Sequence, residues 1–140
     1  MRTLVARYRE EARVGIADLE RHVPDPLGQL RSYAGYWEGC ITDASASFCI
    51  CALLASELPI LPEEVALEVR AHFRFLSAWL TSVFERGAQQ KLFHLAGAPR
   101  AEAETFMAAI HGAMLSARAY GDPKMFGVVT TPLLDRLSAR

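Results

Sequence analysis

The sequence lacks several features that mark large classes of proteins. It contains no asparagine and therefore no N-glycosylation sequon. Its three cysteines are too few for a disulfide framework. No uninterrupted apolar run approaches the roughly 20 residues of a membrane-spanning helix, and the N-terminal segment reaches charged residues 9–11 too early for a signal peptide. These absences predict a soluble, cytoplasmic protein, and the length predicts a single domain, 1–140.

An excess of basic residues is also missing. The chain has 15 Lys and Arg against 16 Asp and Glu, a formal net charge of −1 at pH 7. DNA-binding domains usually concentrate positive charge on one face, because neutralisation of phosphates supplies much of their affinity. The charge balance therefore predicts that this chain does not bind DNA by itself.

Strand-forming residues are scarce, whereas helix-forming residues are abundant. Val and Ile together number 13, against 22 Ala and 17 Leu. Apolar residues recur at steps of three and four within segments that Pro and Gly delimit. The pattern predicts an all-α fold without a sheet, with six helices over residues 3–22, 26–40, 48–58, 62–90, 99–120 and 123–138. Pro132 is expected to kink or restart the last helix.

Recognisable catalytic and metal-binding motifs are missing too. There is no Gly-rich phosphate loop and no Gly-x-Ser-x-Gly elbow, and no two histidines have i,i+4 spacing. We therefore predict no enzymatic activity, no cofactor and no metal site. His111 differs from the other histidines because it lies in an otherwise apolar helical segment, where an imidazole needs a polar partner or a cavity.

Cys49 and Cys51 lie two residues apart in a predicted helix. Such side chains point about 200° from each other, so the two thiols cannot bind one metal ion. Cys49 falls in the first helical turn, where the helix dipole can lower the pKa of a thiol. The alternative is that both cysteines are small, buried apolar side chains.

The last two predicted helices carry apolar or small residues on more than one face. One face can pack on the core, and the second predicts a contact with another subunit. We expect a homodimer in which these helices form a four-helix contact across a two-fold axis. The candidate interface residues are Ala108, Gly112, Leu115, Met125, Val129 and Leu133.

Several short motifs follow one another in a characteristic order. They are Pro-Asp-Pro-Leu at 24–27, Tyr33 with Trp37, Cys40, the segment 49–57, Leu-Pro-Glu-Glu-Val at 61–65, Trp-Leu at 79–80, Glu-Arg-Gly at 85–87 and the segment 111–119. This ordered set, which covers nearly the whole chain, resembles the C-terminal regulatory domain of the tetracycline-repressor (TetR) family of bacterial transcription regulators.

The resemblance implies a ligand-sensing and dimerisation domain of a transcriptional repressor. Family members bind DNA through an N-terminal helix-turn-helix domain, and we expect that domain to be absent from this chain. A small, largely apolar effector would occupy a cavity among the central helices. The candidates for its walls are Trp37, Phe48, Leu54, Phe73, Leu76, Ser77, Trp79 and His111.

Two alternatives remain open. One is a sensor of electrophiles or oxidants in the same family, in which Cys40, Cys49 or Cys51 reacts. The other is a small helical enzyme, which the lack of a recognisable acid–base pair disfavours. Without a DNA-binding domain to cover it, the start of the first helix is expected to fray or to expose an apolar patch of Leu4, Val5 and Tyr8.

Overall fold

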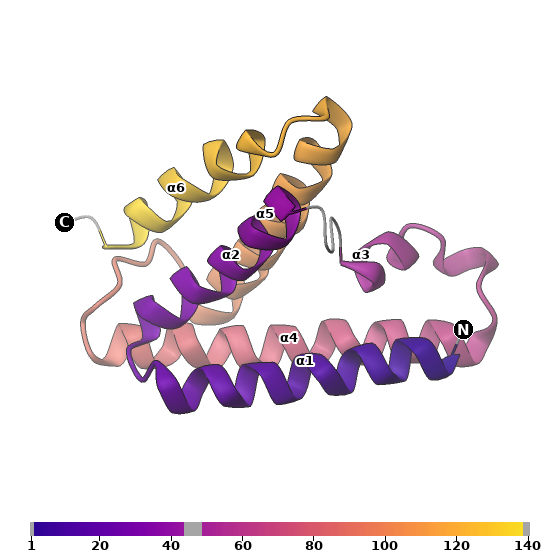
Figure 1. Ribbon diagram of the computed structural model, residues 1–140. Helices are drawn as coiled ribbons and strands as arrows, with labels where there is room; N and C mark the ends of the chain where they lie inside the picture. The colour runs from indigo at the N-terminus through magenta and orange to yellow at the C-terminus, as the bar shows by residue number, and fades with distance from the viewer. Residues whose placement is uncertain (1, 44–48, 139–140) are drawn as a thin grey trace.

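The computed structural model describes residues 2–43 and 49–138 (Figure 1). Over these residues the chain is helical and contains no strand, which confirms the predicted all-α fold. A short 3₁₀ turn, η1 (Leu58–Ile60), accompanies six α-helices: α1 (Arg2–His22), α2 (Pro26–Asp43), α3 (Ile50–Ala55), α4 (Glu63–Gln89), α5 (Pro99–Tyr120) and α6 (Lys124–Ser138). None of the described helices is long and apolar enough to cross a membrane.

Helix α4 lies at the centre of the arrangement and packs against α1, α2, α3 and α5. Figure 1 shows α1 and α4 running side by side, with α2 crossing above them and the α5–α6 hairpin on the far side. A helix with four neighbouring helices has to present apolar residues on several faces. Accordingly, α4 buries residues in every one of its turns, and its fully buried members include Val65, Val69, Leu80, Val83 and Phe84.

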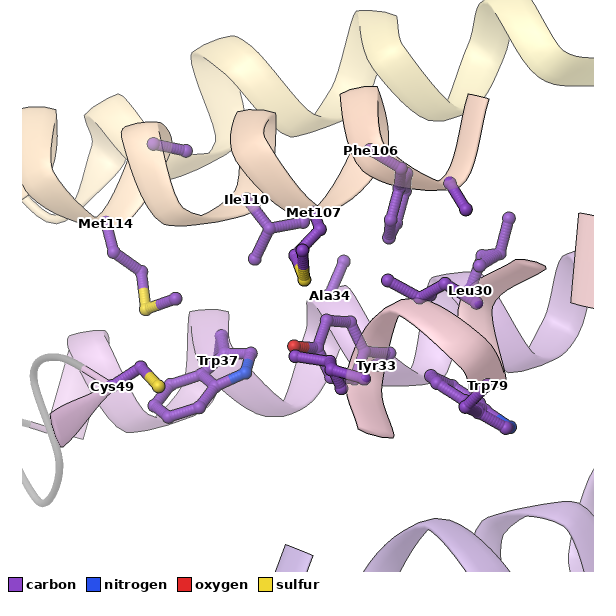
Figure 2. Close-up of a cluster of buried hydrophobic side chains, with 14 of the residues drawn as sticks. Leu30, Tyr33, Ala34, Trp37, Cys49, Trp79, Phe106, Met107, Ile110 and Met114 are labelled. Atoms are coloured by element: carbon purple, nitrogen blue, oxygen red, sulfur yellow. The ribbon is translucent and has the colours of Figure 1, made fainter. Parts of the chain in front are cut away.

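The core is completed by side chains from α2 and α5. Figure 2 shows Met107, Ile110 and Met114 of α5 pointing towards Tyr33 and Trp37 of α2. All five residues are buried. The buried residues of α5 recur at steps of three and four. The apolar periodicity that predicted this helix therefore also identifies the face that packs on the core.

A partly buried polar network holds the corner between α1 and α2 against α4. Gln29 is 1% exposed, and its Nε2 donates to the carbonyl oxygen of Val23 at 2.8 Å. Nη2 of Arg86 donates to Oε1 of Gln29 at 3.0 Å and lies 3.5 Å from a carboxylate oxygen of Glu20. The indole N–H of Trp79 donates to the same carboxylate at 3.2 Å. The polar atoms are thus paired, as burial requires.

Helix α3 is shorter than the predicted segment 48–58. It ends at Ala55, and the chain continues into η1, where Pro59 is the second residue. A proline disfavours helical geometry in the residue before it, here Leu58, so the α-helix cannot continue through this position. Phe48 lies outside the described residues.

Helix α6 is continuous through Pro132, so the predicted restart at this residue is wrong. A proline in a helix interior removes one backbone hydrogen bond. Buried side chains on both sides of it, Phe126, Leu134 and Leu137, pack the helix on the core and offset that loss.

Gly121 ends helix α5 with a left-handed conformation (φ 63°), which glycine adopts without strain.

The start of α1 only partly follows the sequence-based expectation. Leu4 is 51% exposed, as expected, but α1 is helical from Arg2, and Val5 is fully buried. Tyr8 is partly buried and packs against the core. The expected exposure of Val5 is therefore wrong, because this side chain packs in the core, and the expected fraying of this end stays a prediction.

Candidate functional site

A cavity of about 470 Å³ lies between α1, α2 and α4. Its volume is within the range of small-molecule sites, and most of its walls are apolar or aromatic. It follows α1 from Tyr8 to His22, a span of roughly 20 Å on a continuous helix. The lining residues are Tyr8, Glu11, Ala12, Gly15, Ile16, Asp18, Leu19 and His22 of α1, Ser32, Tyr33, Tyr36 and Trp37 of α2, together with Cys49, His72 and Leu76.

Small residues in the middle of α1 leave this space open. Ala12 and Gly15 both line the cavity. A Cβ atom added at Gly15 would meet no heavy atom within 4 Å. Gly15 is exposed, so the cavity is open to solvent at this position, and the small side chains of Ala12 and Gly15 widen it there.

At the buried end of the cavity, Tyr8 contacts both Cys49 and His72. The phenolic O–H of Tyr8 donates to Sγ of Cys49 at 3.2 Å, and the centroids of the Tyr8 and His72 rings are 5.3 Å apart. Burial, reinforced by Cys49, raises the pKa of Tyr8. Burial also raises the pKa of Tyr33. Both phenols are therefore protonated at neutral pH and able to donate hydrogen bonds.

His72 is a buried polar side chain without a partner. It is 3% exposed, and its Nδ1 has no hydrogen-bond partner among the described residues. Burial, with smaller effects from His111 and Arg9, lowers the pKa of His72 to about 4. The ring is neutral at pH 7, with one donor and one acceptor nitrogen. An unpartnered group of this kind costs about 1–3 kcal/mol.

The structure separates the residues that the sequence proposed for a ligand site. Trp37 and Leu76 line the cavity. Phe73 and Ser77 instead line a second hollow between α4 and α5, where the Ser77 hydroxyl donates to Glu104. The distinction follows from helix geometry, since consecutive residues of α4 point about 100° apart.

The other candidates that the structure describes line neither hollow. Trp79 is buried against Tyr33, with ring centroids 5.7 Å apart, and Leu54 is half-buried on α3. His111 is half-buried, with its ring edge-on to Phe73 at 5.5 Å, and burial lowers its pKa. Phe48 is outside the described residues.

Sequence reasoning missed His72 and placed Tyr8 in a different role. The signal for His72 was its position, three residues after Val69 and four before Leu76, on the buried stripe of α4. A histidine at a core position of a helix calls for a partner. No comparable signal pointed to Tyr8, because its contacts come from elements more than 40 residues away.

The three cysteines have different environments. Cys40 is half-buried, Cys51 is buried away from the cavity, and Cys49 is buried on the cavity wall. Cys49 is the residue before the first turn of α3. Burial raises the pKa of Cys51 to about 12, which keeps this thiol protonated. Among the described residues, no group of three His, Cys, Asp or Glu side chains could hold a metal ion.

Three of the residues proposed for a subunit contact form an exposed strip on α5. Ala108, Gly112 and Leu115 of α5 are exposed and follow one another at steps of four and three. A Cβ atom added at Gly112 would meet nothing within 4 Å. The candidates from α6, Met125, Val129 and Leu133, are half-buried.

The sequence matches no protein-family model and no curated protein. Among solved structures, the chain is similar to a TetR-family transcriptional regulator from Agrobacterium tumefaciens, with a TM-score of 0.96 and 62% identity over 99% of this chain and 73% of that one. It shares its fold with the regulatory protein TetR from Rhodobacter sphaeroides (TM-score 0.84, 18% identity, 97% of this chain and 73% of that one). E. coli NemR in its reduced form also has this fold (TM-score 0.83, 15% identity, 99% of this chain and 72% of that one).

The neutral state of His72 makes folding depend on pH. Its pKa of about 4 is below the ordinary 6.5, so between these values the unfolded chain binds more protons, and stability falls as the pH drops. We predict that the free energy of unfolding falls less for His72→Phe, which keeps a ring beside Tyr8, than for the wild type. Between about pH 7 and 4.5 the difference should be about 2 kcal/mol. Urea unfolding at a series of pH values measures this difference. His94→Gln, at an exposed position, is the control that should follow the wild type, and equal acid losses in all three proteins would contradict the prediction.

Proposed function

The chain belongs to the TetR family of transcriptional regulators, and we propose that it is the ligand-sensing and dimerisation domain of a repressor. The cavity between α1, α2 and α4 is the observation that supports this function. A small, largely apolar effector would bind there, against Trp37 and Leu76. We assign DNA binding to a helix-turn-helix domain joined to the start of α1, not to the helices described above. The proposal includes no catalytic step, cofactor or metal ion, and such a regulator would act in the bacterial cytoplasm.

Helix α1 is the element through which a bound effector would act. It forms one wall of the cavity along its length and is held to α4 by polar contacts near both ends. Arg9 forms an ion pair with Glu68 at 2.9 Å, and Glu20 accepts from Trp79 at 3.2 Å. A ligand moves such a helix only if it binds the protein more tightly when the helix is in one position than when it is in another.

A larger side chain on the cavity wall should weaken effector binding. Small apolar compounds that bind the wild type raise its melting temperature by mass action. We predict that Gly15→Leu, on the cavity wall, weakens the binding of these compounds at least about tenfold, which corresponds to about 1.4 kcal/mol. The matched control is Gly35→Leu, because Gly35 is also exposed on a helix with open space around it but does not line the cavity. Thermal shift and calorimetry measure the effect. The proposed function fails if no compound binds or if Gly15→Leu binds as tightly as the control.

The exposed strip on α5 supports the dimerisation part of the proposal. Ala108 and Gly112 are small enough to let a second helix approach closely, and Leu115 supplies an exposed apolar side chain. A two-fold axis would bring the same strip of both subunits together. An obligate dimer of this kind would bury on the order of 2,000 Å² or more.

A charge placed in this strip should separate the subunits. We predict that light scattering at micromolar concentration gives twice the chain mass of 15.5 kDa and that Leu115→Arg shifts the protein towards the monomer. Leu67→Arg is the matched control, because Leu67 on α4 is 52% exposed and Leu115 is 55% exposed. A monomer mass for the wild type, or equal behaviour of the two variants, would reject the dimer.

A second candidate function is a sensor that reacts covalently at Cys49. The favouring observation is that this thiol lies on the cavity wall and accepts the hydrogen bond of Tyr8. With N-ethylmaleimide, the sulfur would add to one alkene carbon and a proton to the other. Mass spectrometry should then find faster alkylation of Cys49 than of Cys51, and a changed rate in Tyr8→Phe. A folded protein in which Cys49 does not react, while all three thiols react after unfolding, excludes this candidate.

A further inference from the structure

The walls of the cavity carry negative charge but no lysine or arginine. Glu11 and Asp18 both line it from α1. Asp18 is already paired with Arg21 at 2.7 Å, and its carbonyl oxygen lies 2.9 Å from a ring nitrogen of His22. Glu11, by contrast, has no ion-pair partner among the described residues. Its carboxylate is the unbalanced charge of the site.

Aromatic rings of α2 face the cavity beside this carboxylate. Tyr36 and Trp37 both line the cavity, and their ring centroids lie 5.2 Å apart in an edge-on arrangement. Burial, the Cys40 thiol and, to a smaller extent, the charge of Glu11 raise the pKa of Tyr36. The faces of tyrosine and tryptophan rings attract cations, whereas they do not attract anions.

A buried polar group with an incomplete set of hydrogen bonds also belongs to the cavity wall. His72, 3% exposed on the cavity wall, leaves Nδ1 without a partner among the described residues. Buried polar groups in proteins are almost always paired. Because Nδ1 is itself inaccessible, a ligand hydroxyl, amide or carbonyl would supply the missing hydrogen bond only after the imidazole ring turns towards the cavity.

We infer that the effector is an aromatic compound that carries a protonated amine. The amine would lie between the carboxylate of Glu11 and the rings of Tyr36 and Trp37, and the aromatic body would lie against the apolar wall formed by Ile16 and Leu76. This inference rests on the proposed function, because it requires that the cavity binds a small molecule. It goes beyond that function by naming the charge of the ligand and the residue that selects it.

Three probes with one aromatic body and different charges test this inference. They are 1-naphthylmethylamine, 1-naphthalenemethanol and 1-naphthoate, which are cationic, neutral and anionic at pH 7. We expect calorimetry on the full chain to show the amine binding about three- to tenfold more tightly than the alcohol, with the carboxylate weakest. Glu11→Gln should remove the advantage of the amine and leave the affinity for the alcohol unchanged. The control is Glu10→Gln, because the neighbouring Glu10 does not line the cavity and is paired with Arg13 at 2.8 Å.

The outcomes separate this inference from the function on which it rests. If the alcohol or the carboxylate binds at least as tightly as the amine, or if Glu11→Gln keeps the preference, the inference is wrong and the ligand-binding function stands. If none of the three probes binds, the inference is also wrong. A cavity that also binds none of the small apolar compounds tested with Gly15→Leu contradicts the proposed function itself.

Discussion

The parallel pairing of α1 with α4 is the constraint on which the rest of the structure depends. Near one end, Val5 is buried in the core, and Arg9 forms an ion pair with Glu68 at 2.9 Å. Near the other end, Glu20 accepts the hydrogen bond of Trp79. Between these contacts Ala12 and Gly15 line the cavity beside the larger Ile16 and Leu19, so the helices are held together at both ends and the cavity lies along the middle of α1. The cavity is therefore a consequence of where the large and small residues of α1 lie, and it needs no irregularity in any helix.

A cavity of this kind reduces the stability of the folded state, and the structure contains a further unfavourable feature in the same place. Empty space removes dispersion contacts from the side chains around it, and His72 adds an imidazole nitrogen without a partner. A protein selected only for stability would place an apolar residue at position 72. That departure from the pattern lies on the wall of the cavity. A ligand that filled the cavity would restore part of the lost dispersion contacts.

Helical periodicity was sufficient to predict the six helices and most of the core, since Val65, Val69, Leu76, Leu80 and Val83 of α4 are buried as their spacing indicates. It was not sufficient to predict the cavity. Both Leu76 and Ser77 were candidates for one site, yet the structure places them in different hollows. Which hollow a residue of α4 faces depends on where α1 and α5 cross it, and these crossings are tertiary contacts that a local pattern does not contain. The same limit applies to Gly87 near the end of α4, where an added Cβ atom would meet the ring of Phe93 at 2.2 Å.

The two sides of α4 differ in how firmly they are packed, and this difference determines which helix a ligand would move. Towards α5, large side chains such as Phe84, Phe106 and Ile110 are fully buried, and the rings of Phe84 and Phe106 are 6.0 Å apart. Towards α1, the middle of the contact is the cavity, and polar groups make several of the contacts near its ends. Displacing α4 from α5 would open voids in a close-packed core, at a cost of several kcal/mol for each large side chain affected. Displacing α1 would disturb half-exposed polar contacts, which contribute little, and a smaller set of buried side chains, Val5 and Ile16. We therefore expect a ligand that changes the spacing of α1 and α4 to move α1 rather than α4.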